Sequence, residues 1–220
     1  MAHRTGHVTQ AFLPVLLLTA AFAQAPPRVL VIGDSISIGY TPLVKELLAG
    51  KADVERVPGN AADTRNTLAH LDDWLARGPY SVIAFNSGLH DLKFTDANQT
   101  FQVPVEEYRR NLPRIVERLR KSGAGLVWAT TTPVEDLRHA KRMAGFSRRE
   151  RDVETYNAAA TPVMKKLGVP VCDLHKAVTK AGADELLGKD GVHFTEAGYR
   201  LLAKKVAAAI SRELKRHAVK

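Results

Sequence analysis

The sequence has a single cysteine and almost no long apolar runs. Cys172 is that cysteine, so the chain cannot form an intrachain disulfide. Beyond residue 25, no stretch is apolar enough to span a bilayer, and the chain contains neither low-complexity segments nor internal repeats. These absences exclude a disulfide-stapled scaffold and a multispanning membrane protein. The 220 residues are enough for one ordinary domain that is stabilised by its apolar core.

The beginning of the chain differs in composition from the rest. Arg4 is its only formally charged residue, an apolar run covers residues 11–18, and small residues follow in an Ala-x-Ala sequence that ends at Ala23. A positive start, an apolar centre and such an ending are typical of a secretory signal peptide. We therefore predict a signal peptide over residues 1–23 and a mature domain over residues 24–220. This domain is expected to be secreted or periplasmic, without stable membrane insertion after cleavage; an uncleaved anchor is the alternative.

The net charge of +9 does not indicate a nucleic-acid partner. The basic residues are scattered along the chain, and in two of their three main clusters they are mixed with acidic residues. Such patterns are typical of solvated helix faces, whereas a nucleic-acid surface requires a focused basic stripe and a recognisable module. An attraction to anionic polysaccharides or envelope surfaces stays open.

Apolar runs alternate with segments of helical periodicity along the whole mature chain. Thr41 and Pro42 are expected to open the first helix as N-cap and first helical residue, and Cys172 to pack inertly in the last strand. The alternation predicts βαβ units and a parallel sheet covered on both faces, that is, an α/β three-layer α/β/α sandwich with a five-stranded parallel sheet of flavodoxin-like type. The expected strands are 28–33, 53–57, 81–85, 125–129 and 169–172, and the expected helices are 41–48, 64–77, 105–121, 148–167 and 196–215.

Unusual polar residues gather at one edge of this predicted sheet. Three of the segments follow the first three strands, and the fourth precedes the last helix. Ligands of open parallel sheets bind at the carboxyl ends of the strands, so we expect these segments to converge there. They are Gly33-Asp34-Ser35, Pro58-Gly59-Asn60, the run from Asn86 to Asp91, and the stretch from Asp190 to His193.

The four segments resemble the sequence blocks of the SGNH hydrolases, the GDSL esterase and lipase superfamily. The resemblance extends from Val29 to about Ile210. It implies the SGNH hydrolase fold and the hydrolysis of esters or thioesters with no cofactor and no metal. The matching residues are Gly33-Asp34-Ser35 of the first block, Gly59 of the second, Gly88-Leu89-His90-Asp91 of the third, where Gly-x-Asn-Asp is usual, and Asp190 with His193 of the fifth.

Chemistry independently favours Ser35, His193 and Asp190 as a catalytic triad. A serine hydroxyl is a weak nucleophile and needs an adjacent base, for which His193 is the candidate. Asp190, three residues earlier, can fix the tautomer of the imidazole and stabilise the imidazolium that forms. A helix cap is the alternative role of an isolated Asp-x-x-His.

Three groups are candidates for the oxyanion hole: the backbone N–H groups of Ser35 and Gly59, and the side chain of His90. His90 stands where the family usually has asparagine, and an imidazole N–H can also donate one hydrogen bond. The alternative is a structural histidine bonded to Asp91. Asn60 and Asn86 flank the site as candidate substrate-binding residues, unless they satisfy loop backbone. Asp34 is expected to brace the nucleophile loop in an Asx-type turn.

Residues 93–104 and 135–147 are expected to form the rim of the pocket. Basic residues of the second segment, among them Arg138 and His139, are candidates to meet a charged leaving group or a glycan. The favoured function is a secreted, monomeric serine esterase acting through an acyl-serine on a small-molecule or glycan ester, preferentially carbohydrate O-acetyl groups. The alternatives are a lysophospholipase or short-chain thioesterase, a non-catalytic carbohydrate-binding relative, and a metal-dependent phosphoesterase that uses Asp34, Asp190 and His193.

Overall fold

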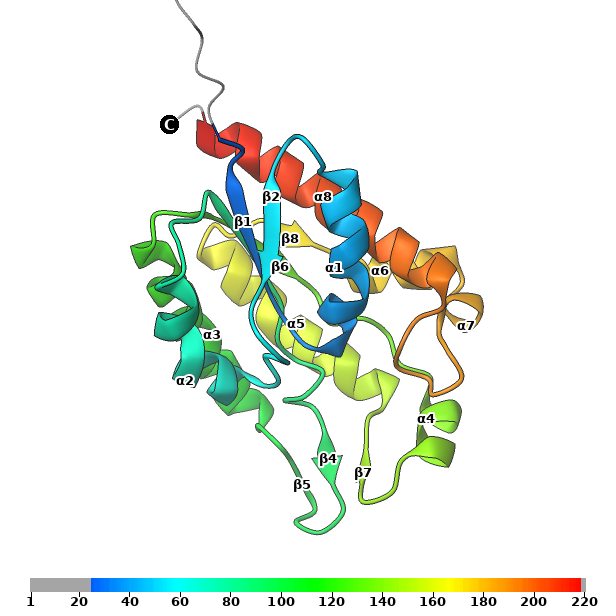
Figure 1. Cartoon of the computed structure of the whole chain (residues 1–220). Coiled ribbons are helices and arrows are strands. Elements are labelled where there is room, and N and C mark those ends of the chain that lie inside the picture. The colour runs from blue at the N-terminus through cyan, green and yellow to red at the C-terminus, as the bar shows by residue number, and fades with distance from the viewer. Residues whose placement is uncertain (1–24, 219–220) are drawn as a thin grey trace, which may run out of the picture.

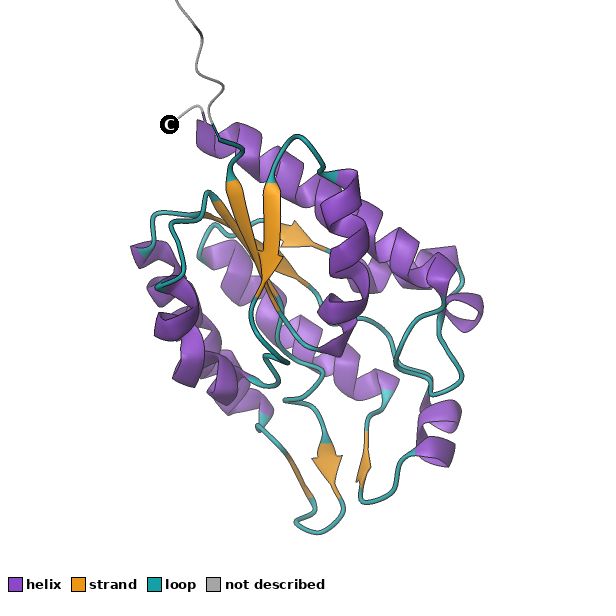
Figure 2. Cartoon of the chain, in the orientation of Figure 1, coloured by secondary structure: helices purple, strands orange, loops and turns teal. Residues whose placement is uncertain are grey.

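The structure is a computed structural model that describes residues 25–218. The predicted signal peptide lies outside these residues. A five-stranded parallel sheet forms the centre of the fold (Figures 1 and 2), and its strand order is β2-β1-β3-β6-β8. The five-stranded parallel sheet of flavodoxin-like type predicted from the sequence is therefore confirmed. Its strands are β1 (Arg28–Ile32), β2 (Asp53–Arg56), β3 (Val82–Phe85), β6 (Gly125–Ala129) and β8 (Val171–Cys172).

Helices cover both faces of this sheet and complete the three-layer sandwich (Figure 2). One layer contains α1 (Ser35–Leu47), α6 (Leu174–Ala181) and α8 (Glu196–Ala218), in which α8 packs against both α1 and α6. The other layer contains α2 (Thr64–Leu75), α3 (Val105–Lys121) and α5 (Glu150–Lys166), which pack in that order. Two short helices, α4 (Asp136–Arg142) and α7 (Ala183–Leu186), lie in the connections.

The first helix begins at Ser35, so the prediction that Thr41 and Pro42 open it is wrong. Asp34 is the N-cap, and its side chain accepts a hydrogen bond from the N–H of Ile36 at 2.9 Å. Pro42 lies inside the helix and removes one backbone donor. The helix continues through it because Ile36, Tyr40 and Val44, at helical spacing, are buried in the core. The sequence rule for proline at a helix start was outweighed here by core packing.

A second, small sheet projects from the main fold (Figure 1). It contains β4 (Phe94–Thr95), β5 (Thr100–Phe101) and β7 (Phe146–Ser147), paired antiparallel in the order β5-β4-β7. The sequence did not predict these strands. The sheet joins the two segments that were expected to form the rim, because β4 and β5 come from the first and β7 from the end of the second.

Apolar side chains fill the space between the sheet and its two helical layers. All four residues of β3 are buried, and so are Val29 to Ile32 of β1. Cys172 is buried in this core, and burial raises the pKa of its thiol to about 11, as expected for a packing residue. None of the helices within residues 25–218 has the length and apolarity needed to cross a membrane.

Candidate active site

Two hydrogen bonds join Ser35, His193 and Asp190 at the carboxyl edge of the main sheet. His193 Nε2 lies 2.9 Å from Ser35 Oγ, although the two residues are 158 positions apart in the chain. His193 Nδ1 lies 2.6 Å from Asp190 Oδ2. The other carboxylate oxygen of Asp190 accepts the backbone N–H groups of Val192 and His193 at 3.0 and 2.9 Å. The structure thus brings together the three residues that the sequence singled out.

The charge of Asp190 determines which nitrogen of His193 can act as a base. Burial alone would raise the pKa of this carboxyl group, but the hydrogen bonds from the His193 ring and from two backbone N–H groups lower it to about 2. The carboxylate is therefore ionised at neutral pH and accepts the Nδ1–H of the neutral imidazole. This bond leaves the Nε2 lone pair free to accept the Ser35 hydroxyl proton.

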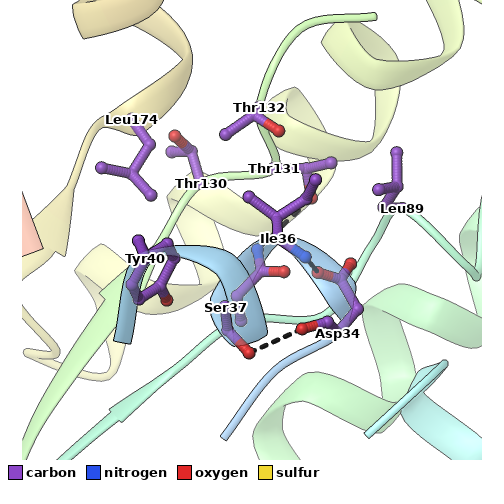
Figure 3. A pocket seen from close by; sticks show the side chains of 10 residues that line it. Asp34, Ile36, Ser37, Tyr40, Leu89, Thr130, Thr131, Thr132 and Leu174 are labelled. Carbon is purple, nitrogen blue, oxygen red and sulfur yellow. Dashed lines mark hydrogen bonds between the residues drawn. The ribbon is translucent and has the colours of Figure 1, made fainter. Parts of the chain in front are cut away.

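Ser35 occupies the first position of α1, where backbone N–H groups and the helix dipole favour negative charge. Asp34 caps this helix from a buried position, so its predicted bracing role is confirmed. The hydroxyl of Ser37 also donates to the backbone oxygen of Asp34 at 2.7 Å (Figure 3). A Cβ atom on Gly33 would lie 2.9 Å from Ser37 Cβ, so the glycine before Asp34 allows the tight approach of strand end and helix.

The proposed oxyanion donors differ in how they are held. Gly59 has φ +65°, a left-handed conformation that favours glycine, and no atom lies within 4 Å of where its Cβ would be. Backbone conformation, and not crowding, is therefore what requires a glycine here. Within residues 25–218 the ring of His90 makes no hydrogen bond, and Asp91 instead accepts from the backbone N–H and hydroxyl of Thr64 at 3.0 and 2.5 Å. The alternative His90–Asp91 bond is thus not made.

The surroundings of His90 favour its neutral form. Burial lowers the pKa of its imidazole, the charge of Asp34 opposes this, and the charges of Arg148 and Lys93 lower the pKa further. A neutral imidazole has one N–H donor and one acceptor nitrogen. It therefore has a donor that could serve an oxyanion beside Ser35.

Asn60 and Asn86 both use their side chains to hold loops. Asn60 Oδ1 accepts the N–H of Ala62 at 2.8 Å, and Asn86 Nδ2 donates to the backbone oxygen of Ala129 at 2.9 Å. These bonds match the structural alternative that was left open for the two residues. Contact with a substrate stays a prediction for both.

A small cavity of about 10 Å³, enough for one water molecule, lies beside Asp34 and Ile36 (Figure 3). Residues from α1, from the loop after β3 and from the loop after β6 surround it. Ser37 and Tyr40 of its wall belong to the buried side of α1, so the cavity lies between this helix and the sheet. The other lining residues are Asn86, Leu89, Thr130, Thr131, Thr132 and Leu174.

The loop that contains Asp190 and His193 docks against the start of α4. The N–H of Glu135 donates to the backbone oxygen of Gly191 at 2.7 Å. Gly191 has φ +72°, and a Cβ atom there would collide with the backbone oxygen of Glu135 and lie 2.9 Å from the N of His139. Because there is no room for a side chain, glycine is the residue that permits this contact.

The prediction that Arg138 and His139 meet a leaving group or glycan is wrong. Arg138 donates to the carboxylate of Asp184 at 2.7 Å and to three backbone oxygens between residues 184 and 188. His139 has 2% of its surface exposed and lies beneath the docked loop. Arg138 therefore ties α4 to the segment before Asp190, and His139 packs beneath the loop. Among residues 25–218, no three His, Cys, Asp or Glu side chains are grouped closely enough to hold a metal ion.

Sequence reasoning missed Arg148, which it placed on a solvated helix face. Only 9% of this residue is exposed, and its Nε donates to the backbone oxygen of Leu89 at 2.7 Å. The helix α5 begins two residues later, so Arg148 belongs to the end of the small sheet and not to the helix. The adjacent Phe146-Ser147 strand was too short to be recognised from periodicity.

Serine, histidine and aspartate in this hydrogen-bonded order, at the carboxyl edge of a parallel sheet, form the arrangement found in serine hydrolases. The chain matches the GDSL-like Lipase/Acylhydrolase family over residues 31–201. It therefore belongs to this family and is one of its ester hydrolases, which confirms the resemblance noted from the sequence blocks.

Individual relatives agree with this assignment. The chain is 26% identical over 194 residues to the isoamyl acetate-hydrolyzing esterase 1 homolog of Mus musculus, covering 80% of this chain and 78% of the relative. It is 27% identical over 209 residues to the Bos taurus protein of the same name, covering 83% and 84%. The crystal structure of a lipase/acylhydrolase from Enterococcus faecalis has the same fold, with a TM-score of 0.72 and 22% identity over 84% of this chain and 96% of that one.

Proposed function

We propose that the protein hydrolyses carboxylic esters through an acyl-serine intermediate, with Ser35 as nucleophile, His193 as general base and acid, and Asp190 as its orienting carboxylate. The continuous hydrogen-bond chain from Ser35 Oγ through His193 to Asp190 is the observation that supports this most. Esterases that use this chemistry are labelled at the nucleophile by fluorophosphonates. We expect the wild-type protein to be labelled at Ser35 and the Ser35→Ala variant to be neither labelled nor active.

The proposed reaction follows from the positions of these groups. His193 Nε2 takes the hydroxyl proton while Ser35 Oγ attacks the ester carbonyl, and the resulting imidazolium is stabilised by Asp190. The N–H groups of Ser35 and Gly59 and the imidazole of His90 stabilise the oxyanion. His193 then protonates the departing alcohol oxygen, and a water molecule activated by the same nitrogen hydrolyses the acyl-serine.

Within this chemistry, we propose that the acyl group is short and that acetyl esters of carbohydrates are the preferred substrates. Two mammalian relatives carry names that specify hydrolysis of isoamyl acetate, an acetyl ester. The carbohydrate part of the proposal depends on the predicted export of the protein.

A panel of substrates tests the acyl preference. Acetylated sugars, para-nitrophenyl esters of increasing chain length and acyl-CoA should be compared by kcat/KM on the mature protein. We expect the highest values for acetyl esters and a decline from butyryl onward. A steep rise with chain length would instead indicate the lysophospholipase or thioesterase alternative, and loss of activity on chelation would indicate the metal-dependent one.

We further propose that the protein is exported after removal of residues 1–23 and acts as a monomer. The composition of the N-terminal segment supports export. N-terminal sequencing of the protein recovered from the periplasm or medium should begin at Gln24, and light scattering should give the mass of one chain. Retention of Met1 in a membrane fraction would indicate the anchor alternative.

A further inference from the structure

Two cationic residues adjoin the same end of the small sheet: Lys93 precedes β4 and Arg148 follows β7. In the antiparallel register of β4 and β7, Phe94 pairs with Ser147 and Thr95 with Phe146. Extending this register by one residue places Lys93 opposite Arg148. Residues opposite each other in an antiparallel pair present their side chains on the same face.

Both cations contact the same aromatic ring. Lys93 Nζ lies 4.3 Å and Arg148 Cζ 5.0 Å from the centroid of the Phe146 ring. The ring attracts each cation but does not neutralise it. In the described part of the chain, no carboxylate lies within 4.0 Å of the Lys93 or Arg148 nitrogens, although twelve such ion pairs occur elsewhere in it.

Most of the Arg148 side chain is buried, and only the outer nitrogens of its guanidinium group lack a protein partner among the described residues. Its residue is 9% exposed, and Nε is fixed by the backbone oxygen of Leu89. Between residues 25 and 218, neither outer nitrogen makes a hydrogen bond, and neither is among the polar atoms that are sealed from solvent without a partner. The outer edge therefore keeps its donors free and open to solvent, in the fork geometry that suits a carboxylate.

Arg148 is bonded to the segment that contains His90, the proposed oxyanion donor. Leu89, to which Arg148 is bonded, precedes His90 and lines the same cavity as Asp34 and Ile36, the two neighbours of Ser35. Burial lowers the pKa of Arg148, and the charges of Asp34 and Asp190 oppose this only in part. Both carboxylates are occupied, Asp34 by the N–H of Ile36 and Asp190 by His193, so neither forms an ion pair with Arg148.

We propose that Arg148, assisted by Lys93, binds a carboxylate on the ester substrate and makes the enzyme selective for anionic esters. This inference rests on the proposed ester hydrolysis at Ser35. A substrate carboxylate would supply the acceptors that the Arg148 fork lacks, at a place where two cations share one aromatic ring and no carboxylate of the described residues pairs with them. An acetylated acidic glycan combines such a carboxylate with the acyl group proposed above.

Matched ester pairs test the selectivity. On the alcohol side, para-acetoxybenzoate is compared with its neutral methyl ester; on the acyl side, phenyl hydrogen glutarate is compared with phenyl valerate. For each pair, the ratio of kcat/KM for the anionic over the neutral ester is measured at low and high salt. We expect a ratio above one in at least one pair, decreasing with salt.

Variants test whether the preference for anionic esters depends on Arg148. Arg148→Met should lower it by about tenfold to a hundredfold, Arg148→Lys should retain part of it, and Lys93→Met should lower it less. Arg149→Met is the matched control, because Arg149 is the next residue, exposed, and should leave the ratio unchanged. The proposal is overturned if no pair shows a preference for the anion, or if Arg148→Met preserves that preference.

A binding measurement separates this inference from the proposed function. Benzoate binding to Ser35→Ala is measured by calorimetry, with Ser35→Ala/Arg148→Met as the comparison. Arg148-dependent binding without any ester turnover by the wild type would refute ester hydrolysis but keep the carboxylate site. Ester turnover without Arg148-dependent binding or selectivity would refute the carboxylate site alone.

Discussion

Replacing Asp190 with asparagine isolates the part of the site that orients His193. The side-chain oxygen of the introduced asparagine can still accept the N–H groups of Val192 and His193, which the carboxylate accepts at 3.0 and 2.9 Å, so the loop should keep its shape. The amide NH2, however, would face His193 Nδ1 and force the ring proton onto Nε2. In that tautomer Nε2 cannot accept the hydroxyl proton of Ser35.

The expected loss in Asp190→Asn is large for catalysis and small for stability. A wrong tautomer in a triad typically costs about 10⁴-fold in kcat, equivalent to about 5 kcal/mol of transition-state stabilisation. The pKa of Asp190 falls from 3.8 to about 2 on folding, but its side chain is 37% exposed, so solvent screening reduces the associated stability to about 1 kcal/mol. Because the pKa is depressed, this stability is present above pH 3.8 and is lost as the pH falls towards 2.

Two measurements separate these effects. Turnover of para-nitrophenyl acetate at pH 7 to 8 gives the change in kcat, and urea unfolding at pH 7 gives the change in free energy of unfolding. Asp190→Ala, which removes the N–H acceptors as well, is the comparison and should unfold more easily than Asp190→Asn. If Asp190→Asn retained kcat within tenfold of the wild type while folding normally, the assignment of His193 as an Asp190-oriented base would be refuted.

Three further predictions concern residues around the triad. His90→Ala should lower kcat on acetyl esters by about 10²–10³-fold with little change in KM, and unchanged turnover would exclude an oxyanion role. Gly191→Ala should lower both activity and the unfolding midpoint, because φ +72° and the backbone oxygen of Glu135 leave no room for a Cβ; a control substitution at the open position Gly168→Asn should preserve activity. Burial lowers the pKa of His139, so the unfolded state binds a proton more readily and the stability should decline as the pH falls below 6.5. The urea midpoints of His139→Phe should decline less over the same pH range than those of the wild type. Equal slopes for the two proteins would contradict this prediction.

Local patterns in the sequence were sufficient for the main sheet, and together with the resemblance to the SGNH sequence blocks they were sufficient for the candidate triad. The residues 29–32 and 82–85 form continuous apolar runs because β1 and β3 are buried on both faces, and such runs are visible without any tertiary information. Ser35 could be linked to His193 because Ser35 follows the first strand and His193 precedes the last helix. The topology of a parallel sheet places both positions at the carboxyl edge.

The features that the sequence did not reveal depend on distant contacts. β4 and β7 are two residues long each, too short for a period, and they pair across more than fifty positions. The burial of Arg148 follows from that pairing. The sequence did not reveal it, because nothing local distinguishes Arg148 from its exposed neighbour Arg149. The start of α1 was misplaced because Pro42 resembles a first helical residue, whereas the buried face of Ile36, Tyr40 and Val44 carries the helix through it.

The proposed nucleophile and its base come from opposite ends of the domain, and α8, which immediately follows the His193 loop, packs against α1. Ribosomal synthesis delivers Ser35 early and His193 late, so a partly made chain contains the hydroxyl group without the imidazole. The hydrolytic centre can assemble only when the last helix has folded onto the first. A partly made or unfolded chain therefore lacks the complete proposed triad.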